Sequence, residues 1–496
     1  MPHKIFEIDE IFRPIAGHVV DLSGSSAIAL ACCCKAFEEP VLSSYWEEQS
    51  LDKLARVIPT GVLKRSGLNR SSYYVCTPEG SKVAKESSLT CAVLQTTTRL
   101  PTQEERDRLL RYAFWIKRIT CVITRRFEAF FKILQLSSPT ETPFPNLRGL
   151  TLWIYPPLLR FLPLFVSSRM STFSISVYRD TPFDPKTVER DYLAAVVAAL
   201  PTSLREFTLR IDHAGLGSGE LKEEVLLMIR RCGQTLVYLK IDVELPAVTI
   251  QRVMRLPNLR TWEVHRSLLP ATLTSCSEAT YLPALRSLAL SATNTYDWVI
   301  FLTSSYPTVD AVRSTLTELN LNDHCAVDPI LIAQICVFTN LTRLEVGWSC
   351  PEDRCTFALA DDDLSRLSLT LPRLEWLTLG HQCDKNTCRT TFRSLLFLSA
   401  RCPRLTSILI HFNTMQITQD IRSLFETTNP GIKELWDSPT RCQIETFSVF
   451  ETPLSLKGSD ELDVVKRGFL NVFPRLRNIA RRCGRTWQCL TEALEK

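Results

Sequence analysis

The chain has 496 residues, which is too long for one compact hydrophobic core and predicts either several domains or one extended repeat array. Apolar residues make up 45% and charged residues 22%, so the composition excludes disorder as the main state. The net charge of +5 is small for this length, which disfavours a nucleic-acid-binding protein. Only 16 residues are glycine, which disfavours glycine-rich phosphate loops.

The 18 cysteines are irregularly spaced and show no disulfide framework. The sequence becomes acidic at Glu7 before an apolar signal segment can form, and the longest run of small apolar residues, 193–200, is far shorter than a membrane span. We therefore expect a protein of a reducing compartment, the cytoplasm or the nucleus or both, with no membrane contact. Its cysteines are expected to act as small buried hydrophobic residues.

Three short helices are predicted within residues 5–58. The first carries apolar residues spaced for one helix face and is expected to end near Pro14 and Gly17. The second covers residues 26–36, and the third begins after Pro40. Three helices of this size bury little surface, so such a unit often needs a partner to cover its remaining apolar side chains.

Residues 27–46 read AIALACCCKAFEEPVLSSYW. This stretch resembles the second half of an F-box, as found in the large fungal F-box family, in its cysteine–lysine–alanine–phenylalanine run, its glutamate–proline pair and its closing tryptophan. Glu10-Ile11-Phe12 and Ile15 are similar to the core of the first helix of that family. The leucine–proline pair that usually opens this helix is not present.

The resemblance implies that this segment docks on the Skp adaptor of Skp–cullin–F-box ubiquitin ligases, and through the adaptor on a cullin. The rest of the chain would then present a protein substrate to the catalytic subunits. The side chains shared between the helical module and the adaptor would be Ile8, Ile11, Phe12, Ile15, Leu30, Cys33, Phe37 and Trp46. For each single residue, internal packing is an equally good explanation.

Residues 59–110 carry no repeat signal and are predicted to form a loop-rich connector that leads into a capping helix. The helix pattern runs from Gln103 to Trp115, with charged residues on one side and apolar residues on the other. We expect this helix to cover the first repeat of the following array.

One pattern recurs over residues 111–496: an apolar residue, two variable residues, an apolar residue, one variable residue and a third apolar residue. Copies begin every 23 to 39 residues, and weaker forms begin at Ile116 and Leu476. The first apolar residues of the clear copies are Leu147, Met170, Leu204, Leu236, Leu259, Leu285, Leu316, Leu341, Leu374, Leu405 and Ile444.

Prolines and helical stretches separate the copies. Pro145, Pro257 and Pro372 each lie two residues before the first apolar residue of a copy, where proline ends a helix and favours an extended chain. Helical patterns lie at residues 191–200, 221–232, 329–338 and 391–402. Because a single strand–loop–helix repeat cannot bury its own apolar face, the copies must stack.

The predicted fold is therefore α/β: a leucine-rich-repeat solenoid of parallel strands with outer helices over residues 111–496. A small three-helix F-box-like module at residues 1–58 and the connector with its capping helix at residues 59–110 precede the solenoid.

Side chains between the apolar positions of each copy point away from the core. Exposed aromatic residues serve as anchors for protein partners, and the candidates for substrate contact are Trp153, Tyr238, His265, Trp376 and His411. An arginine also follows the first apolar position in four copies. The arginines of this ladder are Arg148, Arg205, Arg260 and Arg286. They either bind acidic or phosphorylated segments or form an ordinary solvated face. The solvated face is favoured, because other copies carry valine, threonine or glutamate at the same position.

Several motifs of reactive residues are expected to have no catalytic or metal-binding role. The spacing of Cys350 with Cys355, and of His381 with Cys383 and Cys388, departs from that of paired zinc ligands. Residues 215–219 lack the lysine of a phosphate loop and the spacing of a nucleophile elbow. Residues 361–363 are three aspartates that precede a helical pattern, where acidic residues stabilise a helix N-terminus.

The sequence thus predicts a recognition protein without catalytic residues, cofactor or metal. The leading hypothesis is the substrate-recognition subunit of a Skp–cullin–F-box E3 ubiquitin ligase. The alternative is a leucine-rich-repeat scaffold that binds a protein but does not engage the ligase. Binding of the adaptor by the N-terminal module discriminates between the two.

Overall fold

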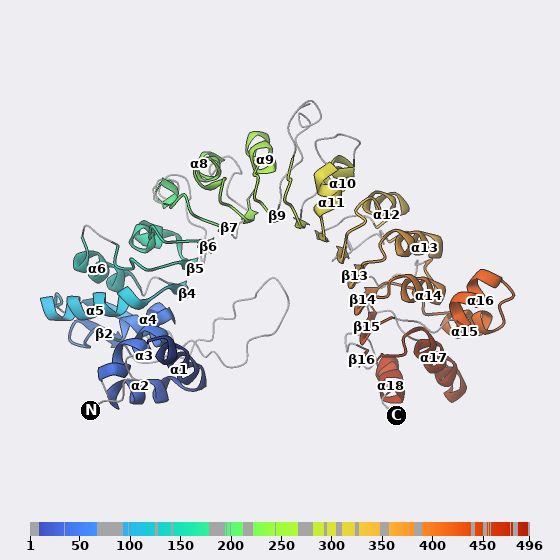
Figure 1. The fold of residues 1–496 in the computed structure, drawn as a ribbon, viewed down its shortest axis with the longest axis horizontal. Coiled ribbons are helices and arrows are strands. Elements are labelled where there is room, and N and C mark those ends of the chain that lie inside the picture. Colours follow the sequence, from blue (N-terminus) through green and yellow to red (C-terminus); the bar gives the residue numbers. More distant parts are fainter. Residues whose placement is uncertain are drawn as a thin grey trace. The chain divides into compact units, whose positions relative to one another are not determined.

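In the computed structural model of the chain, short strands alternate with helices along the sequence (Figure 1). The described residues belong to two compact units, residues 1–236 and residues 237–496. The described ranges, from which a few single positions and pairs are left out, are 9–66, 93–177, 194–211, 222–265, 281–291, 295–303, 310–322, 327–347, 357–380, 389–437, 442–449, 454–456, 458–479 and 485–494.

Three helices open the first unit: α1 (Asp9–Leu22), α2 (Gly24–Cys33) and α3 (Lys35–Glu47). They pack around a small core of Ala16, Ala27 and Val41. The predicted end of the first helix near Pro14 and the predicted start of the third after Pro40 are both wrong, because each proline lies inside its helix. A proline removes one helical hydrogen bond, and the packing of Ala16 and Val41 on the shared core offsets that loss.

The remainder of the first unit is built on a parallel sheet in the order β1-β4-β5-β6-β7. A separate antiparallel pair joins β2 (Leu63–Ser66) to β3 (Val93–Thr97), in a region predicted to be loop-rich. The predicted helix from Gln103 to Trp115 is confirmed as α5 with the same bounds. The other elements are β1 (Glu48–Gln49), α4 (Leu51–Ala55), β4 (Arg118–Ile123), α6 (Glu128–Ser137), β5 (Gly149–Ile154), η3 (Pro156–Phe165), β6 (Thr172–Val177), β7 (Glu206–Ile211) and α8 (Lys222–Cys232).

The second unit carries parallel strands in sequence order from β8 to β16, with helices along one face of the sheet (Figure 1). Its strands are β8 (Tyr238–Asp242), β9 (Thr261–His265), β10 (Ser287–Ser291), β11 (Glu318–Asn322), β12 (Arg343–Val346), β13 (Trp376–Leu379), β14 (Ser407–Ile410), β15 (Thr446–Val449) and β16 (Asn478–Ile479). Its helices are α9 (Ala247–Met254), α10 (Thr295–Thr303), α11 (Asp310–Thr315), α12 (Pro329–Ile335), α13 (Asp361–Thr370), α14 (Phe392–Arg401), α15 (Ile417–Phe425), α16 (Pro430–Asp437), α17 (Ser459–Val472) and α18 (Arg485–Leu494).

The repeat pattern places the strands in one register. Leu239 pairs with Trp262, Trp262 with Leu288, and the same position continues strand by strand to Ile479. Every residue at the three apolar positions of the clear copies whose side chain is described is buried. The prediction of an α/β fold with a parallel sheet and outer helices is thereby confirmed, and this arrangement is compatible with a solenoid.

The pattern also explains why the strands are parallel. Each strand is followed by a helix or loop that returns the chain to the same side before the next strand begins, and such crossovers join parallel neighbours. Buried rings seal the helical side, as where Trp262 of β9 packs edge-on against Trp298 of α10 with ring centroids 5.4 Å apart. The predicted boundaries at residues 58 and 110 stay predictions.

Candidate protein-binding face

One face of the sheet in the second unit is formed by the strand side chains that do not enter the core. We call it the open face and define it by the alternate, incompletely buried positions of β8 to β14, such as Tyr238, Lys240 and Glu263. The burial pattern of these strands alternates between buried and partly exposed residues, as expected for a sheet covered by helices on one side. The open face therefore presents a row of polar and aromatic side chains in fixed register.

Glu263 is the centre of a polar cluster on β8 and β9. Its carboxylate accepts a hydrogen bond from the Tyr238 hydroxyl at 2.5 Å and forms an ion pair with Lys240. His265 Nε2 lies 3.9 Å from the same carboxylate. Burial by itself would raise the pKa of Glu263, but the interactions with His265, Lys240 and Tyr238 outweigh it and lower the pKa to about 2.

A second group, which we call the Trp376 patch, lies on β11, β12 and β13. Arg343 donates to Glu345 Oε1 from Nε at 3.0 Å and from Nη2 at 2.6 Å, and Asn320 donates to Glu345 Oε2 at 2.8 Å. The patch comprises Glu318, Asn320, Arg343, Glu345 and Trp376 on these strands, the buried Thr378 of β13, and Glu375 directly before β13.

Two interactions fix the orientation of the Trp376 ring within this patch. The guanidinium carbon of Arg343 lies 4.9 Å from the centre of the ring, in a cation–π contact. The indole Nε1 donates to Thr378 Oγ1 at 3.2 Å. The side chain nevertheless remains 38% exposed, so an aromatic ring is held in place with part of its surface free for a partner.

The five predicted substrate-contact residues divide by burial. Trp376 is exposed, and Trp153, Tyr238 and His265 are partly buried on strand positions that face away from the core. His411 is 0% exposed, so its predicted place on the surface is wrong. The alternation that predicted it ends with β14 at Ile410, and the next residue turns into the core beside Phe357, with ring centroids 5.5 Å apart.

The four arginines of the predicted ladder are all exposed, at the positions directly before β5, β7, β9 and β10. Their side chains form no row across a whole sheet, because Val237, Thr317 and Thr342 occupy the same place before other strands.

The adaptor-contact residues predicted in the N-terminal helices also differ in exposure. Ile15 is 47% exposed and Cys33 is exposed, whereas Leu30 and Phe37 pack partly against the helix core. Trp46 is only 7% exposed, with its ring 5.0 Å from that of Tyr112 on α5.

The structure adds two apolar side chains that the sequence reasoning missed. Leu22 of α1 is 72% exposed and Ile28 of α2 is 46% exposed. The stretch 24–33 is only weakly amphipathic, so its sequence periodicity does not show that Ile28 is exposed. Ile8 and the side chains of Ile11 and Phe12 lie outside the described residues.

The acidic run 361–363, which forms the first turn of α13, joins two neighbouring repeats. Asp363 accepts a hydrogen bond from the Ala360 backbone N–H at 2.8 Å, which confirms the predicted capping role. Asp361 reaches the next helix, where it accepts from the backbone N–H of Thr391 at 2.7 Å, from the Thr391 hydroxyl at 2.6 Å and from Ser394 Oγ. These aspartates therefore stabilise helix starts.

Clusters of metal-binding side chains and membrane-spanning helices are two further features of the described ranges to consider. A search of those ranges gives no group of three or more potential metal-binding side chains, and the cysteine and histidine motifs at 350–355 and 381–388 lie outside them. The glycine-rich stretch 215–219 also lies outside them. None of the described helices is both long and apolar enough to span a membrane.

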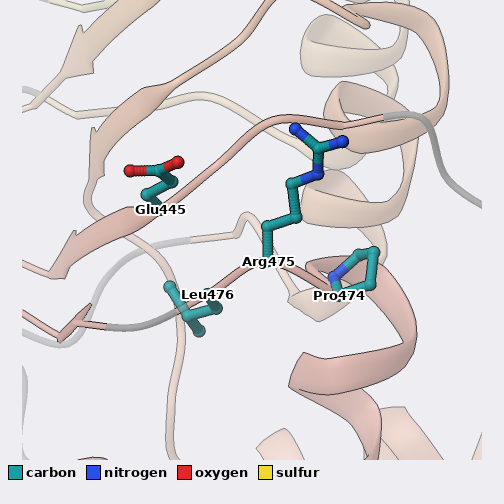
Figure 2. A pocket seen from close by; sticks show the side chains of 4 residues that line it. All are labelled: Glu445, Pro474, Arg475 and Leu476. Atoms are coloured by element: carbon teal, nitrogen blue, oxygen red, sulfur yellow. The ribbon is translucent and has the colours of Figure 1, made fainter.

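One surface hollow of about 280 Å³ lies near the last strands of the sheet, lined by Glu445, Pro474, Arg475 and Leu476 (Figure 2). Its charged groups are one carboxylate and one guanidinium, a combination that defines no catalytic or cofactor chemistry. The open face remains the better candidate for function.

Comparison with known proteins adds little to this geometry. No family model and no curated protein matches the chain. Among solved structures, the chain is similar to one in the crystal structure of the Rad7 and Elc1 complex in yeast, with 14% sequence identity and a TM-score of 0.34 over 66% of this chain and 76% of that chain. A likeness this distant carries no argument about function, which must be inferred from the residues themselves.

Proposed function

We propose that this chain is the substrate-recognition subunit of a Skp–cullin–F-box E3 ubiquitin ligase and is itself without catalytic residues. The N-terminal helices would bind a Skp-family adaptor, and the open face of the sheet would bind a protein substrate. The reducing interior of the cell, in cytoplasm or nucleus, is the compartment in which such a complex would act.

The observation that carries the proposal is the exposed apolar surface of α1 and α2. Ile15, Leu22 and Ile28 are all more than two-fifths exposed, and Ile28 lies within the stretch that resembles an F-box. Ile15 and Leu22 are seven residues apart on one helix and so lie on the same helix face, and exposed apolar side chains gathered on one face mark a surface that a partner covers. The similarity of residues 27–46 to the F-box family supports the Skp adaptor as that partner.

The alternative, a repeat scaffold outside the ligase, is favoured by one observation. Trp46 packs against Tyr112 of α5, and β1 directly after α3 pairs with β4 of the sheet. The N-terminal helices are thus joined to the first repeats and would also serve as a cap that covers their end.

Adaptor binding by the full-length chain tests the proposal. The Ile15→Asp/Ile28→Asp double variant should lose binding to purified Skp adaptor in a pull-down or by calorimetry, because each aspartate would place a charge in an apolar interface. Both positions are exposed, so the fold should be retained. The matched control is Val248→Asp on α9, an equally exposed apolar residue of the second unit.

If the wild-type chain, shown to be folded by circular dichroism, does not bind the adaptor, the ligase role is wrong and the scaffold remains. If the double variant binds as tightly as wild type, a different surface engages the adaptor and the assignment of α1 and α2 is wrong.

A further inference from the structure

The Trp376 patch presents an aromatic ring whose position is already fixed. Arg343 covers part of one ring face, Thr378 accepts from the indole N–H, and Arg343 is itself held by Glu345. A side chain that is ordered before binding loses little conformational entropy when a partner arrives. Exposed, ordered tryptophans are for this reason frequent anchors of protein interfaces.

The patch is also acidic. Three glutamates, Glu318, Glu345 and Glu375, stand against one arginine, Arg343, which leaves a net charge of −2 at pH 7. Glu318 and Glu375 are exposed on the same part of the sheet: Glu318 lies opposite Arg343 in the strand register, one strand further from Trp376, and Glu375 directly precedes Trp376 in the sequence.

A neighbouring arginine, Arg373, lies two residues before Glu375 and adds one positive charge beside the patch. The guanidinium of Arg373 donates to Asn340 Oδ1 at 2.8 Å in the turn before β12. Arg343 is already neutralised by Glu345, so a second cation can approach the tryptophan without facing an unpaired charge.

The cluster around Glu263, elsewhere on the open face, has a different balance of charge. There Glu263 is neutralised by Lys240, and the exposed Arg260 and Arg286 lie just before β9 and β10. The two ends of the open face therefore differ in sign, and the acidic end is the one that holds the exposed tryptophan.

We propose that the Trp376 patch binds a basic segment of a partner protein, with a lysine or arginine side chain over the exposed part of the Trp376 ring. Basic neighbours in that segment pair with Glu318 and Glu375. The attraction between a cation and an indole ring and the complementary charge select a basic partner over an acidic one. This inference rests on the proposed function only in that the open face is the partner-binding surface.

The test uses the full-length chain labelled with 5-fluorotryptophan, in which the Trp376→Phe variant identifies the fluorine signal of Trp376. Two short peptides of equal length serve as probes, one with lysine and arginine and one with glutamate and aspartate between the same glycine and serine residues. The basic peptide should shift the Trp376 signal and bind more weakly as salt rises, and the acidic peptide should do neither.

Variants locate the interaction. Glu318→Gln/Glu375→Gln should weaken binding of the basic peptide roughly tenfold at low salt, and Trp376→Ala by a similar factor. Glu426→Gln, which removes an exposed carboxylate at the end of α15 on the helical side, should leave the affinity unchanged.

The inference is overturned if neither peptide binds, if the acidic peptide shifts the signal equally, or if the double glutamine variant binds like wild type. The same preparations are tested for adaptor binding, which separates the two ideas. A chain that binds the adaptor but not the basic peptide contradicts only this inference. A chain that binds the basic peptide but not the adaptor contradicts only the ligase role.

Discussion

Glu263 illustrates how a single carboxylate is stabilised on the open face. It is partly buried on β9, and its charge is balanced by Lys240 on the adjacent strand and by the hydroxyl of Tyr238. A carboxylate taken out of water without such partners would be costly, so the cluster is stable only while all of its members are present.

The depressed pKa of Glu263 predicts acid sensitivity of a definite sign. Because the folded pKa is about 2 and the ordinary value is 4.5, the stabilisation is complete above about pH 4.5 and is lost as the pH falls toward 2. Glu263→Gln should therefore lower the free energy of unfolding by about 2–3 kcal/mol at pH 7.

Urea denaturation at pH 7 and at pH 3 measures this effect, with Glu426→Gln as the control. The difference between wild type and Glu263→Gln should narrow at pH 3, where the unfolded chain has already taken up its proton. A difference of equal size at both pH values would show that Glu263 contributes through packing and not through its charge.

At the scale of elements, the packing of one helix on another limits the size of the side chain at a position, which helix propensity alone does not show. Gly468 lies inside α17 where that helix crosses α15, and a Cβ at this position would come within 2.7 Å of Ile421 Cδ1. Gly17 lies inside α1, and a Cβ there would meet no atom within 4 Å. Two glycines in similar secondary structure thus have opposite roles.

Alanine at these two glycines should change stability in opposite directions. Gly468→Ala should destabilise the protein by about 1–2 kcal/mol, because overpacking against the buried Ile421 exceeds the gain in helix propensity. Gly17→Ala should stabilise it by about 0.5–1 kcal/mol. Thermal unfolding followed by circular dichroism compares the two, and a stabilising Gly468→Ala would mean that α17 shifts easily on α15.

At the scale of the whole molecule, buried cysteines recur at matching places in several repeats. The thiol of Cys232 donates to the Pro201 carbonyl at 3.3 Å, and that of Cys442 to the Leu405 carbonyl at 3.6 Å, so each ties one repeat to the one before. Burial raises the pKa of Cys402 to about 12 and those of Cys232 and Cys442 to about 11. These thiols are thus structural and unreactive.

Thiol labelling should follow this division. Iodoacetamide at pH 8, read out by mass spectrometry, should modify the exposed Cys32, Cys33 and Cys489 in the native protein. Cys232, Cys402 and Cys442 should react only after denaturant is added. Rapid labelling of these three in the native state would show that the repeats open far more readily than their packing implies.

The sequence by itself determined the repeat architecture. The spacing of three apolar residues per copy predicted which side chains are buried and where each strand begins, because alternation along a strand is a local property of the backbone. The helix at Gln103–Trp115 and the capping role of the aspartates in the first turn of α13 were equally local and were predicted correctly. The expected capping of the first repeat by α5 stays a prediction. A resemblance over residues 27–46 supplied the ligase hypothesis.

Only the tertiary structure decided the burial of side chains whose contacts come from distant parts of the sequence. The burial of His411, the enclosure of Trp46 by Tyr112 and the exposure of Ile28 depend on which residues from distant parts of the sequence pack against them. The fixed geometry of Trp376 likewise requires Arg343 and Thr378 to be brought beside it by the register of neighbouring strands. A period in the sequence states which side of a strand faces the core, whereas contacts between repeats depend on three-dimensional packing that no single repeat encodes.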